Sequence, residues 1–243
     1  MGIYVFRHGE TEYKQGNDRL TLGKANDLTP EGERIVRASA SHLANLIAST
    51  ERGYTTPVKI HTSPMGRCIH SSEIIGNVLT DEGLNVLPIE LNEDLEEVRN
   101  FDWKLFFPLV SGGKVSYAGN DFEIDSRLTN PEELSISSYF RSDAAHNLHD
   151  SVTANMPADY LVRVRSFEKF PNITTRFNAQ LEKIAKSGGM NHVATLHEAL
   201  IGKMIEKLTG NKDAYLGRGK YFGVKFDGEF VPYFTQEDAV LID

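Results

Sequence analysis

The sequence contains a single cysteine, Cys68, among its 243 residues. An intrachain disulfide is therefore excluded, and such low cysteine usage is typical of a reducing compartment. Long hydrophobic runs are also missing, since none approaches the roughly 20 residues of a membrane-spanning helix. No signal-peptide pattern precedes the first predicted strand. Together these absences predict a cytoplasmic protein that has no membrane partner.

Positive charge is scarce as well. The chain carries 26 Lys and Arg residues against 34 Asp and Glu residues, which gives a formal net charge of −8. A chain of this charge binds nucleic acid poorly, so we expect no nucleic-acid partner. A site for an anionic ligand would have to be a local concentration of positive charge.

What the sequence does contain is an alternation of strands and helices. Hydrophobic residues make up 40% and charged residues 25%, as in ordinary globular proteins. Apolar runs predict strands at residues 3–6, 58–61, 86–91, 193–196, 222–226 and 229–233. Helical periodicity and capping signals predict helices that start at Thr29-Pro30 and that cover about 66–80, 174–186 and 197–209. This order predicts a three-layer α/β/α fold with a mainly parallel central sheet. We expect one domain, residues 1–243, with an inserted cap segment around 104–160.

Ionisable side chains follow three of the predicted strands. Arg7 and His8 follow the first strand, Arg67 lies just beyond the second, and His197 follows the strand at 193–196. Parallel strands bring their carboxyl ends to one edge of a sheet, where α/β proteins bind ligands. Two imidazoles and two guanidiniums at one edge would form a pocket for a tetrahedral dianion.

Several motifs together resemble the histidine phosphatase superfamily, which has the phosphoglycerate-mutase-like fold. Their order and approximate spacing agree from residue 3 to about 210. Glu198 departs from the pattern, because the family usually has glycine there. The matching motifs are Arg7-His8-Gly9-Glu10-Thr11, Leu28-Thr29-Pro30-Glu31-Gly32, Thr62-Ser63-Pro64-Met65-Gly66-Arg67 and His197 after an apolar strand.

This resemblance implies catalytic roles for four residues. His8 would be the nucleophile that accepts the phosphoryl group, and Arg7, Arg67 and His197 would hold its oxygens. An imidazole can attack phosphorus, and paired guanidiniums neutralise the charge of the transferring group. The resemblance implies no metal and no cofactor, because the arginines and a histidine would do the work that magnesium does elsewhere.

The resemblance also implies a general acid in the segment after the third strand. Residues 95–103 are similar to the family pattern Leu-x-Glu-x-x-x-Gly-x-Trp, which selects Glu97. Phe101 stands where that pattern has glycine. The alternative acid is Glu93, because Leu91-Asn92-Glu93 is similar to the setting of the acid in phosphoglycerate mutases.

The expected partner is a small phosphorylated metabolite. Thr11, Asn17, Lys24 and Arg99 are candidates for contacting it, and the segment around 104–160 would set its identity. The sequence leaves the oligomeric state open.

Three hypotheses of function remain. The first is a metal-independent phosphomonoester phosphatase that forms a phosphohistidine intermediate on His8. The second is a phosphoglycerate mutase, and the third is a non-catalytic protein that binds a phosphorylated ligand.

Cys68 beside Arg67 lacks a Cys-x5-Arg loop, so we interpret it as a helical core or partly buried residue.

Overall fold

The computed structural model describes residues 2–11, 27–50, 52–96, 113–117, 119–124, 170–210, 216–226 and 230–233. The chain divides into two compact units, Met1–Glu97 with Thr174–Asp243, and Val98–Ile173. In the second unit, β4 (Gly113–Tyr117) pairs antiparallel with β5 (Asn120–Ile124). This hairpin was not predicted. Most of the segment 104–160 lies outside the described residues, so its role as a cap stays a prediction.

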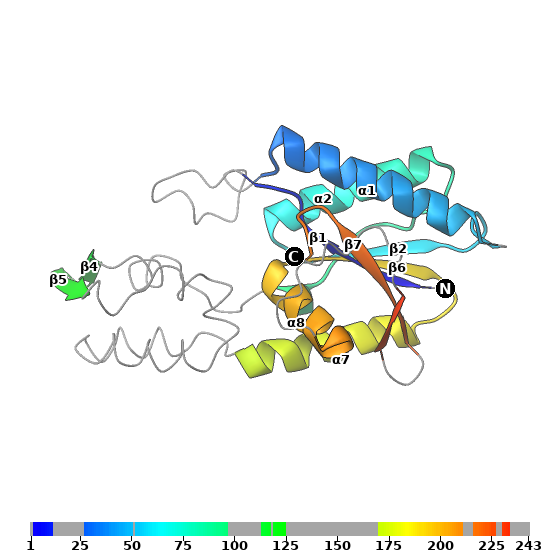
Figure 1. Ribbon diagram of the computed structural model, residues 1–243. Helices are drawn as coiled ribbons and strands as arrows, with labels where there is room; N and C mark the ends of the chain where they lie inside the picture. Colours follow the sequence, from blue (N-terminus) through cyan, green and yellow to red (C-terminus); the bar gives the residue numbers. More distant parts are fainter. Residues whose placement is uncertain are drawn as a thin grey trace. The chain divides into compact units, whose positions relative to one another are not determined.

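The first unit contains a six-stranded sheet with the order β3-β2-β6-β1-β7-β8 (Figure 1). The neighbours among β3, β2, β6 and β1 are parallel, whereas β7 and β8 are added antiparallel at one side. The prediction of a mixed α/β fold with a mainly parallel sheet is confirmed. The strands are β1 (Ile3–Arg7), β2 (Val58–Thr62), β3 (Glu90–Leu91), β6 (Asn191–Leu196), β7 (Tyr221–Phe226) and β8 (Phe230–Tyr233).

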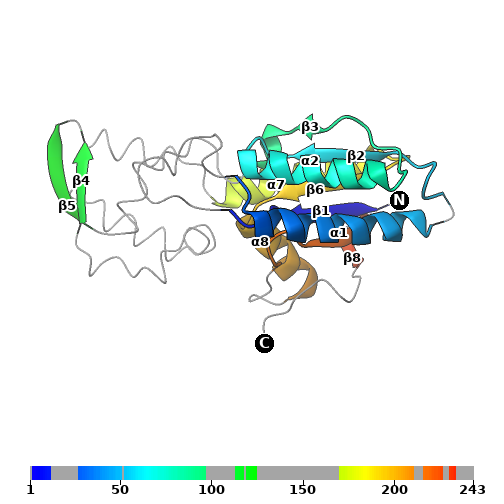
Figure 2. The same cartoon turned by 90° about the horizontal axis from the view of Figure 1, so that it is seen from above.

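Helices cover both faces of this sheet. α1 (Pro30–Ala48) and α2 (Gly66–Asp81) lie on one face, and α7 (Phe170–Lys186) and α8 (Glu198–Thr209) lie on the other (Figures 1 and 2). The three layers predicted from the sequence are therefore present. No helix among the described residues has the length and apolar character that crossing a membrane would require.

The sheet is buried on both faces at its centre. Every residue of β1 and β6 is buried, as expected for parallel strands between two helical layers. Phe6 of β1 is fully buried and stacks on Tyr221 of β7 with ring centroids 4.7 Å apart. Each buried side chain of this size contributes about 1.5–3 kcal/mol to folding.

The start of α1 fixes the chain that follows β1. The Thr29 hydroxyl accepts a hydrogen bond from the Gly32 amide at 2.9 Å, and Pro30 occupies the first turn, as predicted. A Cβ on Gly9 would lie 2.9 Å from the carbonyl oxygen of Gly32. In the structure, glycine at this position lets the chain pack directly against α1.

The third strand is shorter than predicted. Only Glu90 and Leu91 pair with β2, and Val86 forms a single bridge with Val58. Pro88 lies between these two points and has no amide hydrogen to donate to the neighbouring strand. The prediction of a continuous strand over 86–91 was therefore wrong.

Candidate functional site

Strand register brings the two histidines together. β6 lies between β1 and β2, and Arg7 is opposite Leu196 in the β1–β6 pair. His8 directly follows β1 and His197 directly follows β6. The His8 amide continues the pairing, because it donates to the Leu196 carbonyl at 3.1 Å. The imidazole centroids are consequently 5.4 Å apart, with an interplanar angle of 61°.

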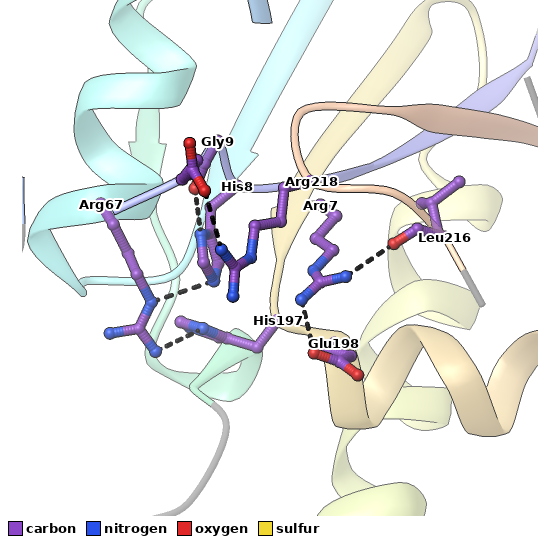
Figure 3. Close-up of polar contacts among 9 residues, drawn as sticks. Arg7, His8, Gly9, Arg67, His197, Glu198, Leu216 and Arg218 are labelled. Atoms are coloured by element: carbon purple, nitrogen blue, oxygen red, sulfur yellow. Dashed lines mark hydrogen bonds and ion pairs between the residues drawn. The ribbon is translucent and has the colours of Figure 1, made fainter. Parts of the chain in front are cut away.

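Arg67 joins these rings from the first turn of α2. Its Nε donates to His8 Nε2 at 3.1 Å, and its Nη2 donates to His197 Nδ1 at 2.9 Å (Figure 3). The turn is positioned by β2, which pairs with β6 up to Thr62 and Thr195. All three side chains are at most 5% exposed. Three strand ends therefore supply one buried cluster.

The hydrogen bonds determine which nitrogen of His8 has a free lone pair. Nδ1 lies 2.7 Å from the carbonyl oxygen of Gly9, which can only accept, so Nδ1 carries the proton. Nε2 is the unprotonated nitrogen, and it accepts from Arg67. The same reasoning protonates His197 on Nε2, because its Nδ1 faces Arg67, which can only donate. His197 Nε2 then donates to the Ser63 hydroxyl at 3.0 Å.

Both imidazoles are neutral in this setting. Burial lowers the pKa of His8 well below its usual range, and the positive charge of Arg67 lowers it further. Burial and Arg67 likewise lower the pKa of His197. A neutral His8 retains the lone pair that nucleophilic attack requires.

Arg7 lies beside this cluster, and neighbouring residues bind both terminal nitrogens of its guanidinium group. Its Nη1 donates to the carbonyl oxygen of Leu216 at 2.8 Å, and its Nη2 pairs with the carboxylate of Glu198 (Figure 3). Arg7 is 3% exposed, whereas the Glu198 side chain is 29% exposed. The guanidinium is thus buried, and one of its partners reaches solvent.

A further cation reaches the site from residues 216–220, which the sequence reasoning missed. Arg218 lowers the pKa of His8 by its charge, although less than burial and Arg67 do, and it pairs with Glu10 at 3.2 Å. The amide of Gly219 donates to the carbonyl oxygens of Arg7 and His8 at 3.1 and 3.0 Å. The sequence feature that could have indicated Arg218 is the run Gly217-Arg218-Gly219 before a strand, but this run by itself suggests only a turn.

The remaining candidates have different positions. Thr11 is buried and forms a bridge with Leu28, and Glu93 is exposed in a short 3₁₀ helix (Glu93–Leu95) after β3. Cys68 is buried in α2, as predicted, with its sulfur 3.5 Å from His197 Nε2. Four candidates lie outside the described residues and stay predictions: Asn17, Lys24, Glu97 and Arg99.

The chain that leads to Glu97 is held by α7. Arg176 of α7 donates to the carbonyl oxygen of Asp94 at 2.5 Å and to that of Glu96 at 3.0 Å. This pair of bonds fixes the backbone immediately before the predicted acid.

Among the described residues, no three His, Cys, Asp or Glu side chains are grouped to hold a metal ion.

Comparison with solved structures places this fold among known ones. A phosphoglycerate mutase from Bacillus anthracis aligns with a TM-score of 0.59 and 19% identity over 96% of this chain and 91% of its own. An alpha-ribazole phosphatase from Shigella flexneri gives 0.53 and 17% over 100% of both chains. A phosphoserine phosphatase from Entamoeba histolytica gives 0.52 and 14% over 99% of this chain and 98% of its own. At these identities the similarity establishes the fold alone.

Sequence comparison adds the family. No curated protein sequence matches the chain. The family model of the histidine phosphatase superfamily, branch 1, matches residues 3–106, a range that includes Arg7, His8 and Arg67. The resemblance to this superfamily that the motifs carry is thereby confirmed over this range.

Proposed function

We propose that this protein is a phosphomonoester phosphatase that works through a phosphohistidine intermediate on His8 and needs no metal ion. The observation that carries the proposal is the hydrogen-bonded cluster of His8, Arg67 and His197, with Arg7 beside it. Members of the matched superfamily and the named structural neighbours include phosphatases and a mutase, which supports an enzyme acting on a small phosphorylated metabolite.

In the first step His8 Nε2 attacks phosphorus, forming a P–N bond as the P–O bond to the leaving group breaks. Arg67 Nε, which donates to this nitrogen in the structure, transfers its hydrogen bond to a phosphoryl oxygen and frees the lone pair. The ring becomes positively charged as the P–N bond forms, and the Gly9 carbonyl stabilises that charge through the Nδ1 proton.

The phosphoryl group carries negative charge throughout the transfer. Arg67 and Arg7 supply guanidinium N–H groups for its oxygens, and His197, whose Nδ1 accepts from Arg67, holds the Arg67 guanidinium in position. Because the two guanidinium groups are buried and held by neighbouring residues, they are positioned before the phosphoryl group binds. Arg218 adds positive charge at the same edge.

The leaving oxygen departs as an alkoxide unless it receives a proton. We assign that proton to Glu97, with Glu93 as the alternative. The resulting carboxylate then takes a proton from the water that attacks phosphohistidine, which releases phosphate and regenerates His8. General acid–base catalysis of this kind contributes about 10²–10⁴-fold.

The test combines turnover with detection of the intermediate. We expect p-nitrophenyl phosphate to be hydrolysed in the presence of EDTA, and rapid quenching to trap an acid-labile, base-stable phosphoryl group on His8 that mass spectrometry locates. His8→Asn should lose both the turnover and the trapped phosphoryl group. His42→Asn is the matched control and should keep both, because His42 lies in α1 and hydrogen-bonds to the Tyr221 hydroxyl.

Three outcomes would overturn the proposal. Near-normal turnover by His8→Asn would exclude His8 as the nucleophile. Conversion of 3-phosphoglycerate to 2-phosphoglycerate in the presence of a bisphosphorylated primer, without net release of phosphate, would assign the mutase reaction instead. Inertness in both assays would favour a non-catalytic ligand-binding protein.

A further inference from the structure

We propose that Glu198 weakens phosphate binding by competing with the bound phosphoryl group for Arg7. The inference rests on the proposed function, because it takes a phosphoryl group as the ligand of Arg7. It adds a role for a residue that lies directly after His197 and opens α8. That role is to weaken the hold of the site on inorganic phosphate, the product of the reaction.

Both terminal nitrogens of the Arg7 guanidinium already have hydrogen-bond partners. Nη1 donates to the Leu216 carbonyl and Nη2 pairs with a Glu198 carboxylate oxygen. A phosphoryl oxygen that takes Nη2 must displace the carboxylate or share the donor with it. The second arrangement brings two anionic oxygens together in a buried site, where the repulsion between like charges is strong.

Glu198 is free to turn away from Arg7. Its side chain is 29% exposed and belongs to the first residue of α8, so rotation carries the carboxylate toward water. The positive end of the helix dipole remains close to it there. Arg7 is 3% exposed and keeps its bond to Leu216, so the guanidinium stays in place when Glu198 turns away.

The consequence is a site in which one arginine is neutralised until phosphate arrives. Each phosphate that binds must replace an existing charge-assisted hydrogen bond, so only part of the interaction with Arg7 contributes to affinity. The same replacement operates in reverse after hydrolysis, when Glu198 returns to Arg7 and favours release of the product.

The experiment measures binding of inorganic phosphate to the full chain by isothermal titration calorimetry. Removing one competing charge-assisted bond should lower the Kd of Glu198→Gln about tenfold relative to the wild type, with a similar change for Glu198→Ala. The matched control is Glu182→Gln, which removes the same charge from an exposed α7 pair with Lys186. The control should bind phosphate as the wild type does.

The direction of the change separates this role from a supporting one. If Glu198 only held Arg7 in position, both variants would bind phosphate more weakly, and that result would overturn the inference. An unchanged Kd, or no phosphate binding by the wild type and the variants, would also overturn it. Because the titration needs no turnover, an inactive wild type that binds phosphate would contradict the proposed function and leave the comparison of Kd values valid.

Discussion

Two buried histidines make the stability of the sheet depend on pH. His61 of β2 and His192 of β6 are 6% and 3% exposed, and their rings stack with centroids 5.4 Å apart. His61 Nε2 lies 3.2 Å from His192 Nδ1, so one neutral ring donates to the other. Burial, followed by the charge of His61, lowers the pKa of His192 to about 4.

The sign of the effect follows from where the proton is held. In the unfolded chain His192 titrates near 6.5, so between pH 6.5 and about 4 the unfolded state binds a proton that the folded state does not. The contribution of His192 to the free energy of unfolding is complete above pH 6.5 and is lost as the pH falls toward 4. The full shift corresponds to about 3 kcal/mol, of which about 2 kcal/mol is lost by pH 5.

The assay is urea unfolding followed by circular dichroism between pH 7.5 and 5. Wild type should lose about 2 kcal/mol more than His192→Gln over this range. Ser187→Ala is the control, because it removes only the hydroxyl 3.2 Å from His192 Nε2 and keeps both rings. It should follow the pH dependence of the wild type. Equal losses in wild type and His192→Gln would refute the reasoning.

Two other substitutions test how the site is supported. In Gly32→Ala, the new Cβ would lie 2.3 Å from the backbone oxygen of Glu10, so α1 must shift. We expect a cost of about 1–3 kcal/mol in urea unfolding, and a change below about 0.5 kcal/mol would contradict this contact. Arg176→Met removes both bonds to the carbonyl oxygens of residues 94 and 96. It should lower kcat for an alkyl phosphomonoester, whose leaving alkoxide needs a proton, about tenfold with a smaller change in KM, because the proposed acid would be less well positioned. An unchanged kcat would exclude that role.

The rule that parallel strands bring their carboxyl ends to one edge predicted that the central residues of the site lie close together. Arg7, His8, Arg67 and His197 follow buried strands whose patterns are clear, and parallel pairing places those strand ends at one edge. The sequence also predicted the start of α1, because its capping interaction is local: the Thr29 hydroxyl bonds to the amide of a residue within the first turn.

Other features depend on contacts that no local pattern encodes. Whether Glu198 meets Arg7, or Arg218 lies near His8, is decided by the packing of α8 and of residues 216–220 against β1. The tautomers of His8 and His197 follow from which atoms face them, and spacing in the sequence does not contain that information. The shortened third strand has a local cause in Pro88, which the apolar pattern of the run concealed.

The position of β6 between β1 and β2 has a consequence for how the protein is made. β1 and β2 each pair with β6 and do not pair with each other, so neither places its strand end correctly until β6 has joined the sheet. During synthesis β1 and β2 leave the ribosome well before Asn191–Leu196 do. Until β6 is available, His8 and Arg67 therefore cannot take up the positions beside His197 that the structure shows, so the cluster forms only late in folding.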